Sequence, residues 1–342
     1  MKKLLLATAV AALSVSAAQA APQVYGKAFL TVDYQDMDYA QEDLVQTGEE
    51  GGSDTSLNST GSRIGLKGGE ALTANTDLVY QLEYGVSVDD NDDQFTARDT
   101  YLGLSNKQYG TMVAGRLTTI DDQIQYANQA SGGVLGGDDV LATVTAPRAD
   151  NAFAYFSPNY NGMQLMAMYA LDDDQDWSEE DGIYGLSEEA GKHEKWGVGA
   201  KYEPANQPFK VGATYMAAGD ALKTARVNGA YDLTSALTVG GQYQWTDFDR
   251  SEDENAYTLS AAYKTATPWT VYGQLDMVTD AVGIEGFDRD RAILGGKYAF
   301  NANTTGHVYG AYLTQDDQPV AGTNLRRDND GFGIGTGIEY KF

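Results

Sequence analysis

The sequence predicts an all-β chain that closes into a 16-stranded antiparallel transmembrane β-barrel. Segments of about ten residues alternate apolar and polar side chains with a period of two, as strands with two different faces do. Aromatic residues recur at segment ends on the apolar face, where a membrane barrel places its interfacial girdles. With Gly 39, Tyr 23 and Pro 7 among 342 residues, the composition suits short strands and tight turns. It does not suit a helical bundle.

The charge balance and the cysteine count exclude several classes of protein. Acidic side chains outnumber basic ones 49 to 23, giving a net charge of −26, so the chain offers no global basic surface for nucleic acid. There is no cysteine, which excludes a disulfide framework, thiolate metal sites and cysteine catalysis. The two histidines argue against an imidazole-rich metal site.

Residues 1–20 have the pattern of a secretory signal peptide. Lys2 and Lys3 precede an apolar stretch over 4–13, and Ala-Gln-Ala at 18–20 resembles a cleavage site. A retained membrane anchor is the alternative, but the apolar stretch is too short to span a bilayer as a helix. Residues 21–342 are therefore expected to form the barrel, with a charge of −26 − 2 = −28 after the two lysines are removed.

The strands are predicted from alternation taken in order along the chain. A typical case is 237–245, where Leu, Val, Gly, Tyr and Trp alternate with Thr, Gly, Gln and Gln. A soluble β-sandwich would alternate too, but it could not cheaply bury the charges that these polar faces carry, such as Glu83 and Arg291. The predicted strands are 24–34, 58–67, 75–88, 96–105, 111–117, 148–157, 163–171, 196–203, 209–218, 224–231, 236–247, 255–264, 269–279, 290–299, 304–314 and 331–342.

The connections between these strands alternate in length, as in a barrel with short periplasmic turns and long external loops. The short turns include 67–74, 106–110, 158–162 and 231–236, whereas the long acidic connections include 36–57, 171–195 and 314–331. An even number of strands allows closure, which removes the strand edges that lipid cannot satisfy. Sixteen strands also leave room for an aqueous lumen.

Five short motifs, in order, resemble the Gram-negative general diffusion porins. They lie at residues 62–68, 98–104, 109–116 and 151–160, and at the terminal Tyr-Lys-Phe of 340–342. The resemblance covers the mature chain and is densest between residues 62 and 170. It implies an outer-membrane homotrimer whose third external loop folds inward to narrow the pore. It also implies that Phe342 is part of a signal read by the outer-membrane insertion machinery.

The segment expected to fold inward is 117–147. It lacks a sustained alternating pattern, and segments this long inside a compact domain are usually functional or disordered. Leu135, Val140, Leu141 and Val144 are apolar enough to pack against a wall, although a solvated outer loop is the alternative. Its acidic residues are candidates for the acidic side of a constriction: Asp121, Asp122, Asp138 and Asp139, the last two being favoured.

The matching basic side is expected from Arg63, Arg98 and Arg148. These occupy the positions where similar porins carry a basic cluster, and each lies on the polar parity of its strand. Because arginine keeps its charge at any relevant pH, such a cluster facing loop carboxylates would set up a transverse field across the pore. The arginines could also serve to fix the loop through ion pairs. The family's loop motif has an acid two residues before Gly136, where this chain has Val134.

Other chemistry has weaker support in the sequence. Acidic runs at 89–93, 172–174 and 316–317 could bind Ca²⁺ or Mg²⁺ and bridge to lipopolysaccharide, or they could be solvated loops; no other cofactor is indicated. A lipid hydrolase would need a Ser with a nearby His base, and neither His193 nor His307 has a partner motif, so no enzyme is expected.

The sequence therefore predicts an outer-membrane pore for passive diffusion of small hydrophilic solutes and ions, with mild cation selectivity. Rings of carboxylate favour cations, whereas rings of Arg or Lys favour anions. Two alternatives stay open at this point: a substrate-selective outer-membrane channel, and a structural or adhesion barrel. Neither a continuous lumenal aromatic ladder nor another motif favours one of them.

Overall fold

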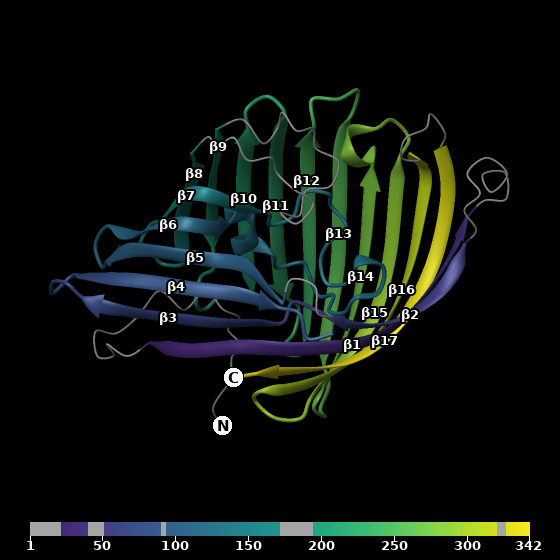
Figure 1. Cartoon of the computed structure of the whole chain (residues 1–342), viewed down its shortest axis with the longest axis horizontal. Coiled ribbons are helices and arrows are strands. Elements are labelled where there is room, and N and C mark those ends of the chain that lie inside the picture. The colour runs from purple at the N-terminus through teal and green to yellow at the C-terminus, as the bar shows by residue number, and fades with distance from the viewer. Residues whose placement is uncertain (1–21, 40–50, 90–93, 172–193, 320–325) are drawn as a thin grey trace.

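Apart from one interrupted strand, each strand pairs with its neighbour in sequence, and the last strand pairs with the first (Figure 1). The computed structural model describes residues 22–39, 51–89, 94–171, 194–319 and 326–342. Within these residues β1 (Gln23–Tyr39) pairs antiparallel with β17 (Arg326–Lys341), so the sheet closes into a ring. The predicted antiparallel barrel is confirmed.

Twelve of the strands follow one another as an antiparallel ladder, with register shifts between β4 and β5 and between β6 and β7. They are β4 (Thr76–Val86), β5 (Phe95–Asn106), β6 (Gly110–Thr118), β7 (Arg148–Phe156), β8 (Met163–Ala170), β9 (Lys195–Tyr202), β10 (Phe209–Ala218), β11 (Leu222–Asp232), β12 (Leu237–Asp247), β13 (Asp253–Lys264), β14 (Trp269–Thr279) and β15 (Asp288–Ala299). The predicted positions of these strands agree with the structure to within a few residues.

The second strand of the barrel is interrupted. Both β2 (Gly52–Ser59) and β3 (Arg63–Ala71) pair with β1, one beyond the other along its length. Residues 60–62 break the ladder between them, and Gly61 there has a positive φ of 62°. The Ser62 Oγ accepts the Phe29 N–H at 2.9 Å and so satisfies a donor beside the break. Because β2 and β3 fill one place in the ring, the barrel has sixteen strands.

Two of the predicted external loops are shorter than the sequence indicated. Residues 36–39 and 52–57 belong to β1 and β2, and β16 (Thr304–Pro319) and β17 continue into the predicted loop 314–331. The prediction was wrong there because most of these residues are polar or charged, so the apolar alternation ends before the backbone pairing does. Backbone pairing needs no apolar side chain, so a hairpin can continue into water beyond the membrane.

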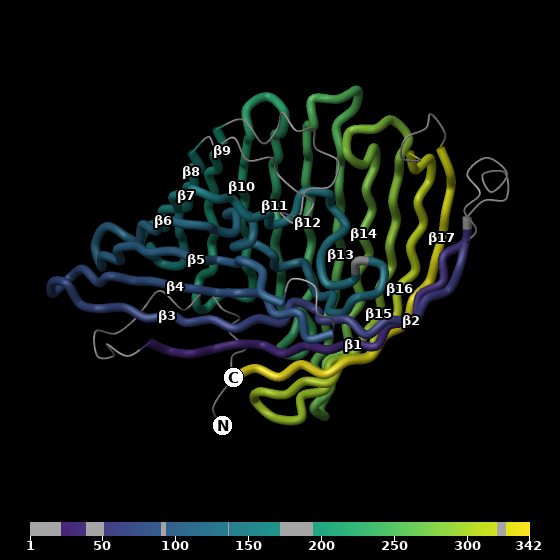
Figure 2. Tube along the Cα trace, in the orientation of Figure 1, coloured from purple at the N-terminus to yellow at the C-terminus, as the bar shows by residue number. Residues whose placement is uncertain are grey.

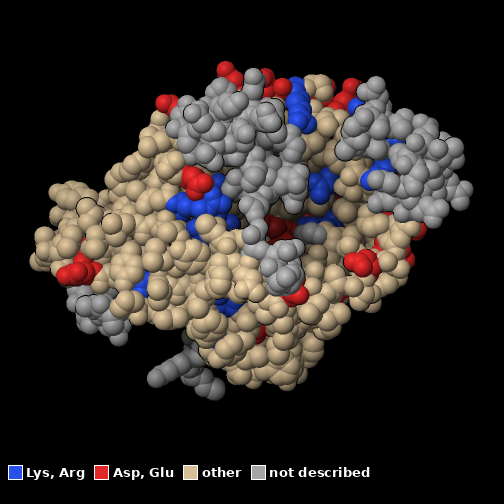
Figure 3. Space-filling view, in the orientation of Figure 1, with Lys and Arg blue, Asp and Glu red and all other residues tan. Residues whose placement is uncertain are grey.

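Side chains separate by parity between the two faces of the wall. Along β14, Val271, Leu275 and Met277 are exposed on the outer face, while Gln274 and Asp276 are buried on the inner face. Figure 3 shows charged side chains gathered around the central hollow and the upper rim, and a mainly uncharged surface over the strands at its left. An apolar outside and a polar inside are what a barrel in lipid around an aqueous lumen requires.

No helix among the described residues is long and apolar enough to cross a membrane. The signal peptide predicted at 1–20 lies outside the described residues.

Phe342 closes the ladder at the end of the chain. The Gly26 N–H donates to the Phe342 carbonyl oxygen at 2.9 Å, and the Phe342 N–H donates to the Gly26 carbonyl oxygen at 3.1 Å. Its half-exposed ring lies 6.1 Å from the ring of Tyr340 on the outer face. The terminal aromatic is thus presented on the outside of the wall.

We expect deletion of Phe342 to impair insertion, because it removes both the closing hydrogen bonds and the exposed aromatic ring. Unfolded chain should accumulate in the periplasm, measured by cell fractionation and by loss of the heat-modifiable folded form. Phe342→Tyr should retain insertion, since it keeps the backbone pairing and an aromatic ring. Undiminished folded protein from the deletion variant would contradict the expectation.

Candidate functional site: a pore constriction

The connection between β6 and β7 lies against the inner face of the wall. It contains two short 3-10 turns. The first, η2 (Ile120–Ile124), contacts β8 to β11. The second, η3 (Val134–Gly136), contacts β1, β16 and β17. Figure 2 shows the trace after β6 running between the strands at the front and the strands β11 to β15 behind them. We call residues 119–147 the constriction segment, because they occupy space inside the ring of strands.

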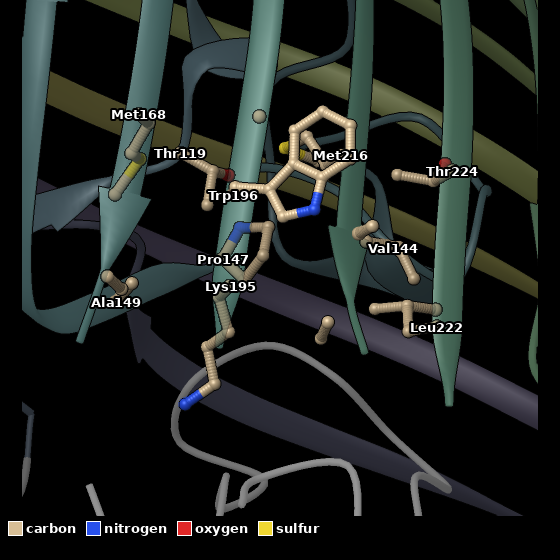
Figure 4. Close-up of a pocket in the computed structure, with 14 residues that line it drawn as sticks. Thr119, Val144, Pro147, Ala149, Met168, Lys195, Trp196, Met216, Leu222 and Thr224 are labelled. Carbon is tan, nitrogen blue, oxygen red and sulfur yellow. The ribbon is translucent and has the colours of Figure 1, made fainter. Parts of the chain in front are cut away.

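Apolar side chains fix the two ends of the constriction segment to the wall. Ile120, Ile124 and Val144 are buried in one cluster with wall residues that include Met166 and Met216. A cavity of about 30 Å³ remains behind this contact. Its lining is almost wholly apolar, and Val144 and Pro147 lie there beside Met168, Met216 and Leu222 (Figure 4). Burial of this apolar surface favours the inward position of the segment over a solvated one.

Amide side chains of the wall satisfy the backbone of the segment. The Ala127 N–H donates to the Asn228 Oδ1 at 3.0 Å, and the Gln129 N–H donates to the Gln274 Oε1 at 2.9 Å. On the acceptor side, the Lys297 Nζ donates to the Gln129 carbonyl oxygen at 3.0 Å. An irregular segment lacks ladder partners, so buried N–H and C=O groups need such side chains.

Two buried ion pairs add further anchors. The Arg226 guanidinium lies 3.1 Å from the Asp121 carboxylate, with both side chains almost wholly buried, and it donates to the Val144 carbonyl oxygen at 2.9 Å. On the other side, Arg291 pairs with Asp276 of the neighbouring strand at 2.9 Å. A buried ion pair needs additional hydrogen bonds to offset its desolvation, and the segment supplies them.

Arg291 holds the turn that carries the favoured acidic candidates. Its guanidinium donates to the Leu135 carbonyl oxygen at 3.0 Å and to the Asp139 carbonyl oxygen. Leu135 has a positive φ of 49°, an unusual conformation for a leucine, so the turn depends on contacts that hold it there. With the carbonyl groups bound to the wall, the Asp138 side chain is left exposed to solvent and that of Asp139 half-buried.

A third anchor joins the segment to the first strand. The Tyr309 hydroxyl donates to the buried Asp33 carboxylate and accepts the Gly133 N–H at 3.3 Å. Asp33 also accepts hydrogen bonds from Thr31 at 2.6 Å and from Asn58 at 2.7 Å. This network links β16, β1 and β2 to the segment and leaves Asp33 fully satisfied.

The predicted basic residues Arg63 and Arg98 share one carboxylate on their own wall. The Arg98 Nε donates to Glu83 at 2.7 Å, and the Arg63 Nε lies 3.7 Å from the other oxygen of Glu83. A register shift between β4 and β5, between Leu82 and Tyr84, brings the Arg98 side chain alongside Glu83. The sequence pattern marked Glu83 only as a charge on a polar face.

Arg148, the third predicted basic residue, also has a partner close by. Its Nε lies 3.1 Å from Asp99, which accepts the Thr118 hydroxyl at 2.6 Å as well. Asp99 follows Arg98 directly in the chain, so the same bulge places both. Three arginines therefore share two carboxylates on this side of the lumen, and the prediction had not paired them with either.

The four acidic candidates are placed differently. Asp121 is buried against Arg226 and also accepts the Ala146 N–H at 2.8 Å. Asp122 is exposed and lies within electrostatic reach of Arg148 and Arg98, whereas Asp138 is within reach of Arg291 and Lys27. The Asp139 carboxylate accepts the Val140 N–H at 2.8 Å. The structure brings Asp122 toward the arginines and uses Asp121 as an anchor.

The surroundings raise the pKa of three of these carboxyls. Burial raises the pKa of Asp139 to about 7, with the nearby carboxylates Asp138 and Asp122 adding to the effect. Protein packed around Asp122 raises its pKa to about 6, with Asp121 adding, although solvent reaches its side chain from the lumen. Protein packed around the Asp138 carboxyl raises its pKa as well, although its side chain also reaches solvent. These groups titrate closer to neutral pH than ordinary carboxyls.

No group of three or more His, Asp or Glu side chains suited to a metal ion occurs among the described residues. The acidic runs 90–93 and 172–174 and His193 lie outside them. His307 is buried in β16, with its ring 4.6 Å from that of Phe29.

Comparison with protein families gives one match over most of the chain. A family model described as Gram-negative porin matches residues 7–318. A major outer membrane protein P.IB of Neisseria gonorrhoeae is 26% identical over 343 residues, covering 92% of this chain and 94% of the relative.

Solved structures share the fold. An anion-selective porin from Comamonas acidovorans superposes with a TM-score of 0.68 at 20% identity, covering 94% of this chain and 99% of that one. A trimer form of OmpT, an outer membrane protein of Vibrio cholerae, superposes with a TM-score of 0.62 at 16% identity, over 94% and 99% of the two chains.

We expect Arg291→Met to destabilise the folded protein by about 3–5 kcal/mol, because it leaves the buried Asp276 without an opposite charge and frees the turn at 135–139. The measurement is the temperature at which the folded form converts to unfolded chain in detergent. Arg116→Met is the matched control: its ion pair with Asp150, at 2.9 Å, is partly exposed and should be worth less than about 1 kcal/mol. Equal destabilisation by both variants would contradict the anchoring role of Arg291.

Proposed function

Because the chain belongs to the Gram-negative porin family and is an outer-membrane β-barrel, we propose that it forms a water-filled pore for passive diffusion. The solutes are small hydrophilic molecules and ions, and the pore has a mild preference for cations. Proteins of this family are channels, which gives no support to a catalytic function.

One observation carries the cation preference. Each arginine of the basic wall has a carboxylate on its own side, since Arg63 and Arg98 share Glu83 and Arg148 pairs with Asp99. Across the lumen, the exposed Asp122 and Asp138 form no ion pair with any described residue. The arginine charge is therefore largely compensated where it sits, whereas part of the carboxylate charge faces the lumen uncompensated.

The overall charge acts in the same direction. The formal net charge of the chain is −26, and Figure 3 shows acidic side chains along the upper rim of the barrel. Such charges attract cations over a Debye length of about 10 Å at 0.1 M salt, comparable with the opening of a 16-stranded pore. The preference should weaken as salt is raised, because screening shortens that range.

Anion preference is the second candidate. The Comamonas acidovorans porin, which shares this fold, is anion-selective. In the present chain the three arginines of the basic side share only two carboxylates, Glu83 and Asp99, so one positive charge is left over there. The balance between the charge of this basic side and that of the loop carboxylates decides whether the pore prefers cations or anions.

The assembly that we propose is a homotrimer in contact with outer-membrane lipid and lipopolysaccharide, inserted by the outer-membrane insertion machinery. The trimer form of the Vibrio cholerae OmpT supports it. Bridging of the outer loops to lipopolysaccharide by Ca²⁺ or Mg²⁺ is a further part of the proposal. It is supported by Asp288 and Asp316, which are paired in register at the outer ends of β15 and β16. Unchanged lipopolysaccharide retention after EDTA treatment would argue against it.

We expect Asp138→Asn combined with Asp139→Asn to reduce the cation preference, and Arg98→Gln to strengthen it while increasing conductance. Removing lumenal carboxylate lowers the local cation concentration, whereas removing a guanidinium has the opposite effect. Reversal potentials of the purified protein in planar bilayers under a salt gradient measure both.

Lys107→Gln, in an exposed turn at the other end of the barrel, is the control and should change little. Anion preference of the unaltered protein at low salt would favour the second candidate. Saturable block by one solute would indicate a substrate-selective channel, and absence of conductance a structural or adhesion barrel.

We expect the cation preference to rise as pH increases from about 5 to 8. The raised pKa of Asp122, about 6, and of Asp139, about 7, mean that these carboxyls are protonated and neutral below that range. They become charged as pH rises through it, which adds negative charge to the constriction. Reversal potentials measured across this range in the unaltered protein and in Asp139→Asn test the expectation. A flat profile in the unaltered protein would contradict it.

A further inference from the structure

The external loop between β14 and β15 bends over the mouth of the barrel. Residues 280–287 contain the turn η5 (Ala281–Gly283), in which Asp280 and Val282 have positive φ angles of 52° and 53°. The loop is tied to itself, since the Ala281 N–H donates to the Phe287 carbonyl oxygen at 2.7 Å and the Gly286 N–H to the Asp280 Oδ1 at 2.9 Å. A β-branched residue in this conformation persists only where its surroundings hold it.

Apolar side chains of this loop pack directly on the constriction segment. Ala281 and Phe287 are buried in one cluster with Val140, Leu141 and Ala142 of the segment. The partly buried Val282 belongs to the same cluster and also touches the cluster that contains Val144. Two connections that are far apart in sequence thus share one apolar contact inside the mouth.

Glu254, near the outer end of β13, joins the same two connections by hydrogen bonds. Its carboxylate is wholly buried. One oxygen accepts the Thr143 N–H at 2.9 Å, and the other accepts both the Thr143 hydroxyl and the Val282 N–H, the last at 3.0 Å. A carboxylate placed here accepts three hydrogen bonds, and each of the two connections supplies a backbone donor that no ladder strand could satisfy.

We propose that Glu254 is a positioning residue that couples the external loop 280–287 to the constriction segment. The proposal rests on the proposed pore function. Thr143 and Val282 donate to one buried side chain, so displacement of either connection leaves that carboxylate short of donors and loosens the position in which it holds the other connection. The loop 280–287 carries none of the predicted constriction charges. Through Glu254 it helps to fix the width of the constriction and the positions of the charges there. If the two connections are coupled in this way, a change in the outer loop alters the ion current through the pore.

The first test compares variants that lose the same charge in different surroundings. Glu254→Ala removes both acceptor oxygens, and Glu254→Gln replaces one of them with an NH2 donor. Glu285→Gln is the matched control, because Glu285 lies in the same loop with an exposed side chain. Hydrogen exchange of the folded protein in detergent is followed for peptides covering 135–147 and 280–287. Exchange should accelerate in both peptides of Glu254→Ala, on the order of tenfold, and in neither peptide of Glu285→Gln.

The second test measures the ion current through the pore. In planar bilayers, Glu254→Ala should increase open-channel current noise and shift the reversal potential, with Glu285→Gln matching the unaltered protein. Phe287→Ala, which removes loop packing from Val140 and Leu141, should increase the noise as well. If Glu254→Ala does not fold, Thr143→Val removes one donor only and should give a smaller effect of the same sign.

Two results would overturn the coupling: accelerated exchange confined to one of the two peptides, or unchanged noise and reversal potential in folded Glu254→Ala. Absence of conductance in the unaltered protein would contradict the proposed function instead. The exchange measurement would still decide whether Glu254 couples the two connections.

Discussion

Lipid offers no hydrogen-bond partner to an open strand edge, and the structure of this chain follows from that constraint. The pairing of β1 with β17 satisfies both edges and closes the ring. Closure in turn gives the wall an inside and an outside, so alternation along each strand becomes a separation between lipid and lumen. The buried polar side chains that hold the constriction segment exist only because the inner face is shielded from lipid and need not be apolar.

The inner wall is used in two different ways around its circumference. On the side of β3 to β7, arginines and carboxylates face an open lumen and compensate one another within the wall, as at Glu83 and Asp99. From β8 round to β17 and β1, the constriction segment lies against the wall. Side chains of the wall there, Asn228, Gln274 and Arg291 among them, bind backbone groups rather than solute. The asymmetry arises because one segment lies against one side only.

The same asymmetry accounts for how far the site could be predicted. Arg63, Arg98 and Arg148 could be placed on the lumenal face because parity along a strand is a local property. Asp121 was grouped with the constriction acids because nothing local distinguishes it from Asp122, its neighbour in the chain. The difference lies in Arg226, which is 105 positions away in sequence and buries the first carboxylate while the second stays exposed. The anchors Arg291 and Glu254 were missed for the same reason, since their partners lie in a segment without any regular pattern.

The sequence by itself determined the class of fold, the closed sixteen-stranded barrel, the segment that leaves the ladder and the residue types on each face. Periodicity, turn residues and strand count depend on near neighbours and are therefore visible in a single chain. Only the tertiary structure decided which charge compensates which. Those pairings depend on strand register, on the bulge beside Arg98 and on where the constriction segment lies. Register is fixed by closure of the whole ring, which is a property of all strands together. The energy of a charge pair depends on the distance between the charges in space, and separation along the sequence does not give that distance.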